Sequence, residues 1–350
     1  MAQSSTSYTS KWRCGKTCVI RVPEKIADNV LDYAHDLDAK VDLHTVNEEG
    51  RRYMAYSQMQ MKGLSLERPV NVASVPQRSL FRYPGGKTWL IPKLRVWLMS
   101  MENTPDLFLE PFAGGGIASL TVAFEGLARH VVLAETDEGV SAVWRTLING
   151  QGEWLAEAIL DYKLTLENVK KSLAKDIPGK NIPLKERAFL TILRNRVQRG
   201  GIMAPGAGLV KKGENNRGIA SRWYPETLAK RIRNIGNHRE RMSFYQGDGF
   251  DLIDDYIGDA TAAIYLDPPY VKAAKRLYRN WKIDHRKLFE KMAEFAGPFL
   301  MSYDNNSEIR EMASEFGFEC RPVSMKNTHH AKMKELLISK DIRWLDEFNQ

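Results

Sequence analysis

An apolar run, Ala262–Leu266 (AAIYL), leads directly into the tetrapeptide Asp-Pro-Pro-Tyr at residues 267–270. A short apolar run that stops at such a turn is typical of a strand buried on both faces, as in a parallel sheet covered by helices. Polar groups that act on ligands gather at the carboxyl ends of the strands in such sheets. This junction therefore predicts an α/β fold with a functional site directly after the strand.

Strand-like and helix-like segments alternate along the chain from Leu80 onward. The further strands and helices that we expect lie at 106–110, 131–135, 299–303 and 335–339 (strands) and at 117–127 and 284–295 (helices). Strands separated by helices predict a Rossmann-like, mostly parallel sheet with helices on both faces.

Two other stretches do not follow this alternation of strands and helices. Residues 151–243 are helical and basic, and we interpret them as an inserted, mostly helical subdomain between two parts of one catalytic domain, 79–150 and 244–350. Residues 1–78 form an N-terminal appendage. Its pattern predicts a strand followed by a helix, as in small ribbon-helix-helix DNA binders, but the sequence predicts no second helix after it, so a docking or linker segment is the other interpretation.

The basic charge of the chain is concentrated in one place. The 350 residues have a net charge of +8, yet residues 185–241 alone hold fourteen Lys and Arg against four Asp and Glu, a local charge of +10. Gly-rich text and the aromatic pair Trp223-Tyr224 accompany these charges. A basic, flexible segment with aromatic residues favours a nucleic-acid partner, although a solvated helix face has the same composition.

The composition also indicates where the protein works. There is no apolar run long enough for a membrane span and no secretory signal, so we expect a cytoplasmic protein, associated with the nucleoid if the cell is prokaryotic. The three cysteines are too few for a disulfide framework and fit a reducing compartment. Cys14 and Cys18 have no nearby second pair of ligands, so we expect no metal site.

Two Gly-rich turns precede the insert. The first, Arg82–Lys87 (RYPGGK), lacks the spacing of a P-loop, and its Lys87 suits the carboxylate of a ligand. The second, Glu110–Gly116 (EPFAGGG), lies between a strand and a helix, where glycines allow a ligand to approach the backbone. Glu135 follows about twenty-five residues later, near the spacing at which an acid meets ribose hydroxyls. A surface carboxylate at a strand end is the other interpretation of Glu135.

The Asp-Pro-Pro-Tyr turn suits one kind of chemistry. Prolines fix the backbone and remove N–H donors, which leaves carbonyl acceptors beside the Asp267 carboxylate. A carboxylate and a carbonyl together can accept both hydrogens of an exocyclic amino group, and Tyr270 can stack on the base that carries it. This set of acceptors fits an adenine amine better than a hydroxyl, a thiol or a carbon nucleophile.

In this order, the motifs RYPGGK, EPFAGGG, LAE, YQGD and LDPPY resemble those of the Dam-type (alpha-group) DNA adenine-N6 methyltransferases, which depend on S-adenosylmethionine. MSYDNN (301–306) and KELLIS (334–339) are similar to the downstream strands of that family. The resemblance extends from about Leu80 to about Lys340.

The resemblance implies a role for particular residues. The catalytic residues would be those that hold the flipped target base, Asp267, Pro268, Pro269 and Tyr270. Those that bind S-adenosylmethionine would be Tyr83, Lys87, Glu110, Phe112, Gly114, Gly116, Glu135 and Asp248. The sequence Arg194-Asn195-Arg196 resembles the Asn-Arg element that opens the family's recognition region, so residues 185–241 would face double-stranded DNA. The basic residues that we expect to contact it are Arg194, Arg196, Arg199, Lys211, Lys212 and Arg217.

The chain departs from the family pattern in several places. Tyr83 stands where a Trp is usual, and Glu110 and Glu135 stand where either acid is found. The segment 202–216 does not match the family's Gly-Phe-Asn-Val-Pro hairpin, which leaves the target sequence open. Methylation of cytosine N4 in DNA, methylation of adenine in RNA, and a catalytically inactive DNA-binding regulator remain as alternatives. We expect a monomer or a weak dimer; a cognate restriction system is one possible companion.

Overall fold

The computed structural model describes residues 75–82, 86–175, 181–203, 207–245, 247–269, 283–326 and 332–345. The chain divides into two compact units, Met1–Glu67 and Arg68–Gln350, and all of the described residues belong to the second. Of the expected appendage, residues 1–74 therefore lie outside the described part.

A seven-stranded sheet, with strand order β3-β2-β1-β4-β5-β7-β6, organises the second unit. Five of the strands are parallel to one another; β7 is antiparallel to both of its neighbours, β5 and β6. The strands are β1 (Leu107–Glu110), β2 (His130–Ala134), β3 (Met242–Tyr245), β4 (Ala262–Leu266), β5 (Phe299–Asp304), β6 (Glu319–Lys326) and β7 (Lys332–Ser339). The parallel part of this sheet is Rossmann-like.

The centre of the sheet is apolar because it is covered on both faces. β1 lies between β2 and β4, and Leu107 pairs with His130 on one side and Ala262 on the other. Every residue of β4 is fully buried, which explains why AAIYL is a continuous apolar run rather than an alternating one.

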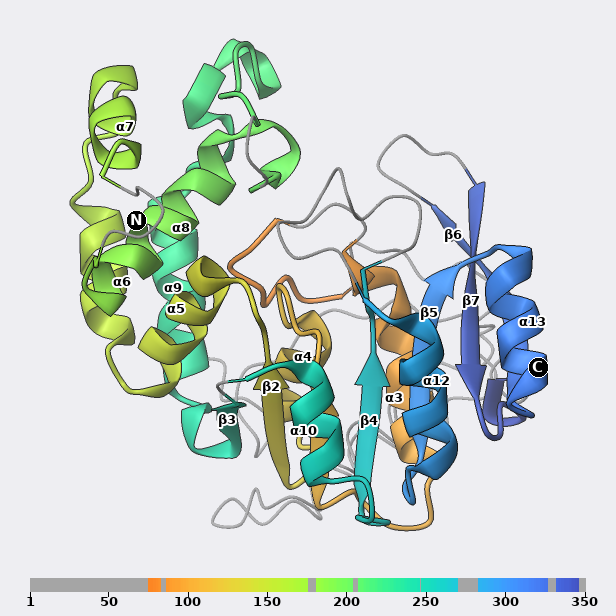
Figure 1. Ribbon diagram of the computed structural model, residues 1–350. Coiled ribbons are helices and arrows are strands. Elements are labelled where there is room, and N and C mark those ends of the chain that lie inside the picture. The colour runs from red at the N-terminus through yellow and green to blue at the C-terminus, as the bar shows by residue number, and fades with distance from the viewer. Residues whose placement is uncertain are drawn as a thin grey trace, which may run out of the picture. The chain divides into compact units, whose positions relative to one another are not determined.

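Helices cover both faces of the sheet (Figure 1). Side chains of α10 (Gly249–Asp255), α12 (His285–Glu294) and α13 (Ser307–Glu315) pack on one face. In the view of Figure 1, α3 (Ile91–Met99) and α4 (Ile117–Glu125) lie behind the strands, and α4 contacts both β1 and β2.

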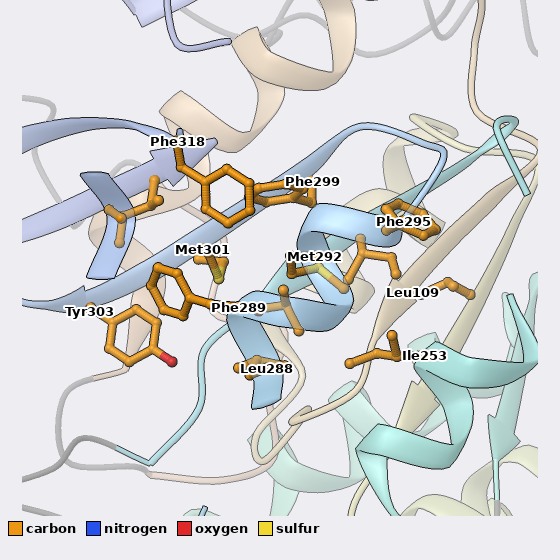
Figure 2. Close-up of a cluster of buried hydrophobic side chains, with 14 of the residues drawn as sticks. Leu109, Ile253, Leu288, Phe289, Met292, Phe295, Phe299, Met301, Tyr303 and Phe318 are labelled. Atoms are coloured by element: carbon orange, nitrogen blue, oxygen red, sulfur yellow. The ribbon is translucent and has the colours of Figure 1, made fainter. Parts of the chain in front are cut away.

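Aromatic side chains form much of the core beneath α12 (Figure 2). Phe289 on α12 lies 5.9 Å from the ring of Tyr303 on β5 and 5.8 Å from the ring of Phe318, between centroids. Phe299 on β5 meets Phe318 edge to face at 4.9 Å. Pairs at these distances add to the free energy that burial of the rings already supplies.

Between β2 and β3 the chain forms a group of helices, drawn together beside the sheet in Figure 1. Two of them begin at side-chain caps: Asp137 accepts hydrogen bonds from Gly139 and Val140, and Thr165 accepts one from Asn168. The helices are α5 (Glu138–Ile148), α6 (Gly152–Leu160), α7 (Leu166–Leu173), α8 (Leu184–Val197) and α9 (Pro225–Gly236), joined in part by short 3-10 turns.

Most of the expected elements are confirmed within a residue or two. β4 has the expected bounds, and α4 and α12 begin within one residue of the expected positions. β3 and β6 were not expected, because MSFY is only four residues long and ECRPVSMK is largely polar. The antiparallel direction of β7 was not expected either. No helix of the described residues is long and apolar enough to cross a membrane.

The core at α12 generates a stability prediction. Phe289→Ala removes a fully buried ring with three aromatic neighbours, so we expect the free energy of unfolding to fall by about 3 to 5 kcal/mol. Leu166→Ala, at a residue that is 51% exposed, is the control and should change it by less than about 0.5 kcal/mol. Denaturant unfolding followed by circular dichroism measures both; equal effects would contradict the packing described.

Candidate active site

Three adjacent strands deliver acidic side chains to one edge of the sheet. Glu135 directly follows β2, Glu110 ends β1, and Asp267 directly follows β4. Because β2, β1 and β4 are parallel neighbours, their carboxyl ends lie side by side. The chain order reverses between β1 and β4, which is the place where open α/β sheets form their ligand crevice.

The Gly-rich turn between β1 and α4 is shaped by a tryptophan from α5. Trp144 donates a hydrogen bond from its Nε1 to the carbonyl of Gly114, at 3.0 Å. Gly116 has a φ of +59°, and a Cβ there would lie 2.5 Å from the Trp144 ring. Only glycine fits at residue 116, so the indole and the turn together fix the backbone that faces the crevice.

Glu135 is tied to the same turn. Its Oε2 accepts a hydrogen bond from the Gly114 amide at 3.0 Å, and its Oε1 accepts one from the Asp137 amide at 2.9 Å. Burial raises the pKa of Glu135 to about 7, with a further contribution from the Asp137 carboxylate, while these backbone bonds act in the opposite direction. The Glu135 carboxyl group is therefore held at the Gly-rich turn, and its role toward the ribose remains a prediction.

Glu110 is buried beneath the Gly-rich turn rather than exposed to solvent. The residue is only 3% exposed, and its Oε2 accepts a hydrogen bond from the Ser119 amide in the first turn of α4, at 2.8 Å. Burial raises the pKa of Glu110 to about 8; the bond to Ser119 lowers it, and the carboxylates of Asp267 and Glu135 raise it further.

Asp267 is held by a buried lysine. The Nζ of Lys87, in the short helix Lys87–Leu90, lies 3.1 Å from Asp267 Oδ1 and 3.4 Å from Glu335 Oε2 on β7. Burial alone would lower the pKa of Lys87, but the two carboxylates outweigh it and raise that pKa. Lys87 is therefore an ammonium shared by two carboxylates.

A second contact holds the same oxygen of Asp267. Ser302 on β5 donates its hydroxyl hydrogen to Asp267 Oδ1, at 3.1 Å. The Ser302 Oγ lies 2.9 Å from the hydroxyl of Tyr265, two residues before Asp267 on β4. Because the one hydrogen of Ser302 is used on Asp267, Tyr265 is the donor in this pair, and the chain of hydrogen bonds runs from Tyr265 through Ser302 to the carboxylate.

The remaining residues expected in the site lie at the same edge or outside the described part. Pro268 is buried and Pro269 is half-buried, while Tyr83 and Tyr270 lie outside the described residues. Phe112 meets Phe250 edge to face at 6.1 Å. Asp248 follows β3, is exposed, and caps α10 through the Phe250 amide.

Most of the basic residues expected to face DNA lie at the surface. Arg199, Lys211, Lys212 and Arg217 are exposed, and Arg194 is half-buried. The backbone here folds back after α8 as a short hairpin: the Val210 amide bonds the Val197 carbonyl at 2.8 Å. The Arg217 guanidinium lies over the exposed ring of Tyr224, 5.6 Å from its centroid. Trp223, by contrast, belongs to the core.

Arg196 lies in the interior rather than at the surface that was expected to face DNA. It is 6% exposed and donates a hydrogen bond to the Leu80 carbonyl. Burial lowers its pKa to about 9, with contributions from Arg231, Arg82 and Arg222. The expectation of a DNA contact at Arg196 is corrected, because charge alone did not reveal that the inner face of α8 carries this side chain.

The Asn-Arg element holds the segment that leads into the first Gly turn. Asn195 accepts a hydrogen bond from the Arg82 amide at 2.9 Å and donates to the Arg82 carbonyl at 3.0 Å. Arg231 on α9 donates to the Ser79 carbonyl at 2.8 Å, and Ser79 in turn donates to the Gly115 carbonyl at 2.6 Å. The insert is thus connected by hydrogen bonds to the Gly-rich turn at the sheet edge.

Residues 83–327, more than half of the chain, match the family described as D12 class N6 adenine-specific DNA methyltransferase. The chain belongs to this family. The matched segment includes the Gly-rich turns, the insert, Asp267 and β5, which are the elements that form the site. The chain is therefore a methyltransferase, and S-adenosylmethionine is its cofactor.

Solved structures of other methyltransferases are similar to the chain at low identity. An rRNA methyltransferase from Streptomyces viridochromogenes is 10% identical, with 80% of this chain and 96% of that one covered and a TM-score of 0.38. A putative RNA methyltransferase from Pyrococcus horikoshii is 12% identical, with 83% and 94% covered and a TM-score of 0.35. A putative class I S-adenosylmethionine-dependent methyltransferase from Listeria monocytogenes is 11% identical, with 90% and 75% covered and a TM-score of 0.33. No curated protein matches the chain.

The site of this methyltransferase fits the chemistry of the cofactor. S-adenosylmethionine carries a sulfonium, an ammonium, a carboxylate and ribose hydroxyls. Glu135, which is bonded to the turn, is the acidic group that would accept hydrogen bonds from the ribose hydroxyls. Glu110, by contrast, is buried beneath the turn and has a raised pKa, so it supports the turn rather than carrying a charge to the cofactor. Gly116, with its φ of +59°, lets the turn pack against the Trp144 ring. Glu135 and Trp144 both hold Gly114, so the backbone beside which the cofactor would lie is fixed. We expect Phe112 and Asp248 to lie beside the rest of the molecule.

Three residues that contact Lys87 or Asp267, directly or through Ser302, were not predicted as site residues from the sequence. Tyr265 and Ser302 read only as strand residues, and Glu335 reads as part of KELLIS. For Ser302 the available signal was a polar residue inside the apolar strand FLMSY, whereas Glu335 follows two lysines in KMKELLIS and only the structure shows that it is buried. Their contacts with Asp267 and Lys87 depend on pairing between strands that are distant in sequence.

The raised pKa of Glu110 generates a prediction on stability. A carboxyl with a folded-state pKa of about 8 and an ordinary value of 4.5 keeps its proton in the folded protein across that window. The folded state therefore loses stability as pH rises from about 5 to 8, by at most about 1.4 kcal/mol per pH unit.

Glu110→Gln removes this dependence, so the difference in unfolding free energy between variant and wild type should grow in favour of the variant as pH rises. Denaturant unfolding at pH 5, 6, 7 and 8 measures it. Glu315→Gln, at an exposed carboxylate, is the control and should show no such trend. A constant difference for Glu110→Gln would show that its carboxyl is ionised throughout.

Proposed function

We propose that this methyltransferase transfers a methyl group from S-adenosylmethionine to the exocyclic amino group of an adenine flipped out of double-stranded DNA. The observation that carries the proposal is the position of Asp267 and the Pro268 carbonyl at the strand switch point, beside the Gly-rich turn and Glu135. Membership in the D12 class family supports the same substrate.

The orientation of Asp267 supports its role as an acceptor. Within the described residues, its contacts with Lys87 and Ser302 both involve Oδ1. These contacts orient the carboxylate and leave Oδ2 to meet a substrate hydrogen. Asp267 Oδ2 and the Pro268 carbonyl would then accept the two N–H groups of the adenine amine.

The amine needs such acceptors because its lone pair is delocalised into the ring. Two hydrogen bonds to acceptors draw its hydrogens out of the ring plane and make the nitrogen more nucleophilic. When bound, the cofactor supplies an electrophilic methyl group on a sulfonium. The C–N bond forms as the C–S bond breaks, so the sulfur leaves as a neutral thioether, and the methylated nitrogen, which is now acidic, releases one proton to water. The contribution of the chain is to position the amine and to stabilise the positive charge that forms on its nitrogen.

The insert would hold the DNA. An amino group inside a duplex cannot reach the methyl group in line with the bond to sulfur, so the base must leave the stack. We expect Tyr270 to hold the flipped base by stacking. Arg199, Lys211, Lys212 and Arg217 are exposed on the hairpin and the loop after it, and we assign them to phosphate contacts. Arg194 remains a weaker candidate, and Arg196 is excluded by its burial.

Asp267→Ala tests the chemistry. We expect methyl transfer to DNA to fall below detection, with cofactor affinity retained, because the variant lacks the acceptor but keeps the Gly-rich turn and Glu135. Transfer of a labelled methyl group to DNA measures activity, and calorimetric titration with S-adenosylmethionine measures binding. Asp254→Ala, at an exposed carboxylate of α10, is the control. Full activity in Asp267→Ala would refute the mechanism.

The modified base identifies the substrate. The chain is expressed in a host without DNA methylation, and methylated nucleosides are then separated from its DNA and RNA. We expect N6-methyladenine in DNA, within a fixed sequence context. N4-methylcytosine, or N6-methyladenine confined to RNA, would instead support another substrate on the same site, and no methylation at all would favour a DNA-binding regulator.

Charge removal on the hairpin tests the DNA-binding role of the insert. With Arg199, Lys211, Lys212 and Arg217 replaced by Gln, we expect weaker DNA binding at low salt. The slope of log K against log salt should be shallower by about 0.9 for each phosphate that the variant no longer neutralises. Fluorescence anisotropy between about 50 and 300 mM salt measures both the affinity and the slope.

The matched control removes basic residues from the opposite edge of the sheet. Arg129 lies just before β2, and Arg343 follows the antiparallel β7, so both are near the amino ends of the parallel strands. Both side chains are exposed. If the double variant Arg129→Gln with Arg343→Gln lost as much DNA affinity as the variant of the insert, the insert would have no special role in DNA binding.

A further inference from the structure

Glu335 is a buried carboxylate that the proposed mechanism does not use. It lies in the amino-terminal half of β7, and it pairs in register with Asp304 at the end of β5. Because β7 is antiparallel to β5, its beginning lies at the same edge of the sheet as the carboxyl ends of β1, β4 and β5. This direction brings a glutamate from the last strand to the site.

A buried carboxylate needs a partner, and for Glu335 the partner is the lysine that also holds Asp267. The side chain of Glu335 is 7% exposed and that of Lys87 is 6% exposed, with 3.4 Å between Oε2 and Nζ. Asp267 is more accessible, with 25% of its side chain exposed, and lies 3.1 Å from the same Nζ. The ammonium is therefore shared between an inner carboxylate and an outer one.

The balance of charge among these groups determines how well Asp267 can act as an acceptor. One ammonium between two carboxylates leaves the group with a net charge of −1. If Lys87 had Asp267 as its sole carboxylate partner, that pair would be neutral, and the ammonium hydrogens would compete with the substrate amine for the carboxylate. With Glu335 present, part of the attraction of Lys87 is directed inward, away from the substrate.

We propose that Glu335 is a positioning residue for methyl transfer: it draws the Lys87 ammonium inward and so keeps Asp267 negative and available to the amino group of the substrate. The inference rests on the proposed amino-group methylation and extends it to a residue of the last strand. Glu335 acts through Lys87 and has no contact with the reacting atoms.

The experiment is a single-turnover measurement with Glu335→Gln, which keeps the shape of the side chain and removes its charge. We expect the rate constant of methyl transfer to fall about tenfold, less than the loss when a direct stabilising group is removed. The dissociation constants for S-adenosylmethionine and for DNA should change less than about twofold, because the Gly-rich turn and the insert are untouched.

Two further variants separate positioning from a loss of structure. Glu335→Asp keeps the charge and should recover part of the rate. In a Lys87→Gln background, adding Glu335→Gln should slow transfer no further, because the group through which Glu335 acts is already absent. Glu315→Gln, which also removes a carboxylate paired with a cation, is the matched control and should transfer methyl groups at the wild-type rate.

Several outcomes would overturn the inference. An unchanged rate in Glu335→Gln does so directly, and a weaker cofactor affinity with an unchanged rate would make Glu335 a cofactor ligand instead. Additive losses in the Lys87→Gln background would show that Glu335 acts independently of Lys87. Absence of methyl transfer to DNA by the wild-type chain is a separate result, which contradicts the proposed function itself.

Discussion

The pairing of β1 with β4 is the interaction on which the site depends. These two strands are adjacent in the sheet although the whole insert separates them in sequence, and backbone hydrogen bonds set their register from Leu107 opposite Ala262. The register places Glu110 at the end of one strand beside Asp267 at the end of the other. Carboxylates with very different surroundings therefore lie at the same crevice. Glu110 is buried under an amide of α4, and Asp267 is partly open and held by Lys87.

Lys87 and Asn195 connect parts of the protein that have different tasks. Lys87 is the last residue of the first Gly turn and joins that turn to Asp267, directly after β4, and to Glu335 on β7, so three separate parts of the chain form one electrostatic unit. Asn195 and Arg231 join the insert to residues 79–82, and Ser79 continues this connection to Gly115. The insert is therefore connected to the Gly-rich turn through hydrogen-bonded backbone, and the DNA binding proposed for the insert would act on the turn along this path.

Prediction from the sequence succeeded where a pattern is local. The apolar run 262–266 predicted β4 because a strand buried on both faces needs no polar residue, and the glycines at 114 and 116 predicted a turn that tolerates a positive φ. Prediction failed where packing between segments distant in sequence determines the burial of a residue or the formation of a strand. Arg196 was expected at the surface because it is basic, yet the inner face of α8 buries it against Leu80. β6 was missed because its outward residues are polar, and it forms only as the partner of β7.

The sequence by itself determined the α/β alternation, the position of Asp267 directly after a buried strand and the concentration of charge in the insert, because each follows from neighbouring residues. Only the tertiary structure decided which groups surround Asp267. Ser302 and Glu335 come from strands later in the chain, and their side chains reach the site only because β5 pairs with β4 and β7 runs antiparallel. Strand order and direction depend on contacts between distant segments, and no local pattern in the sequence encodes them.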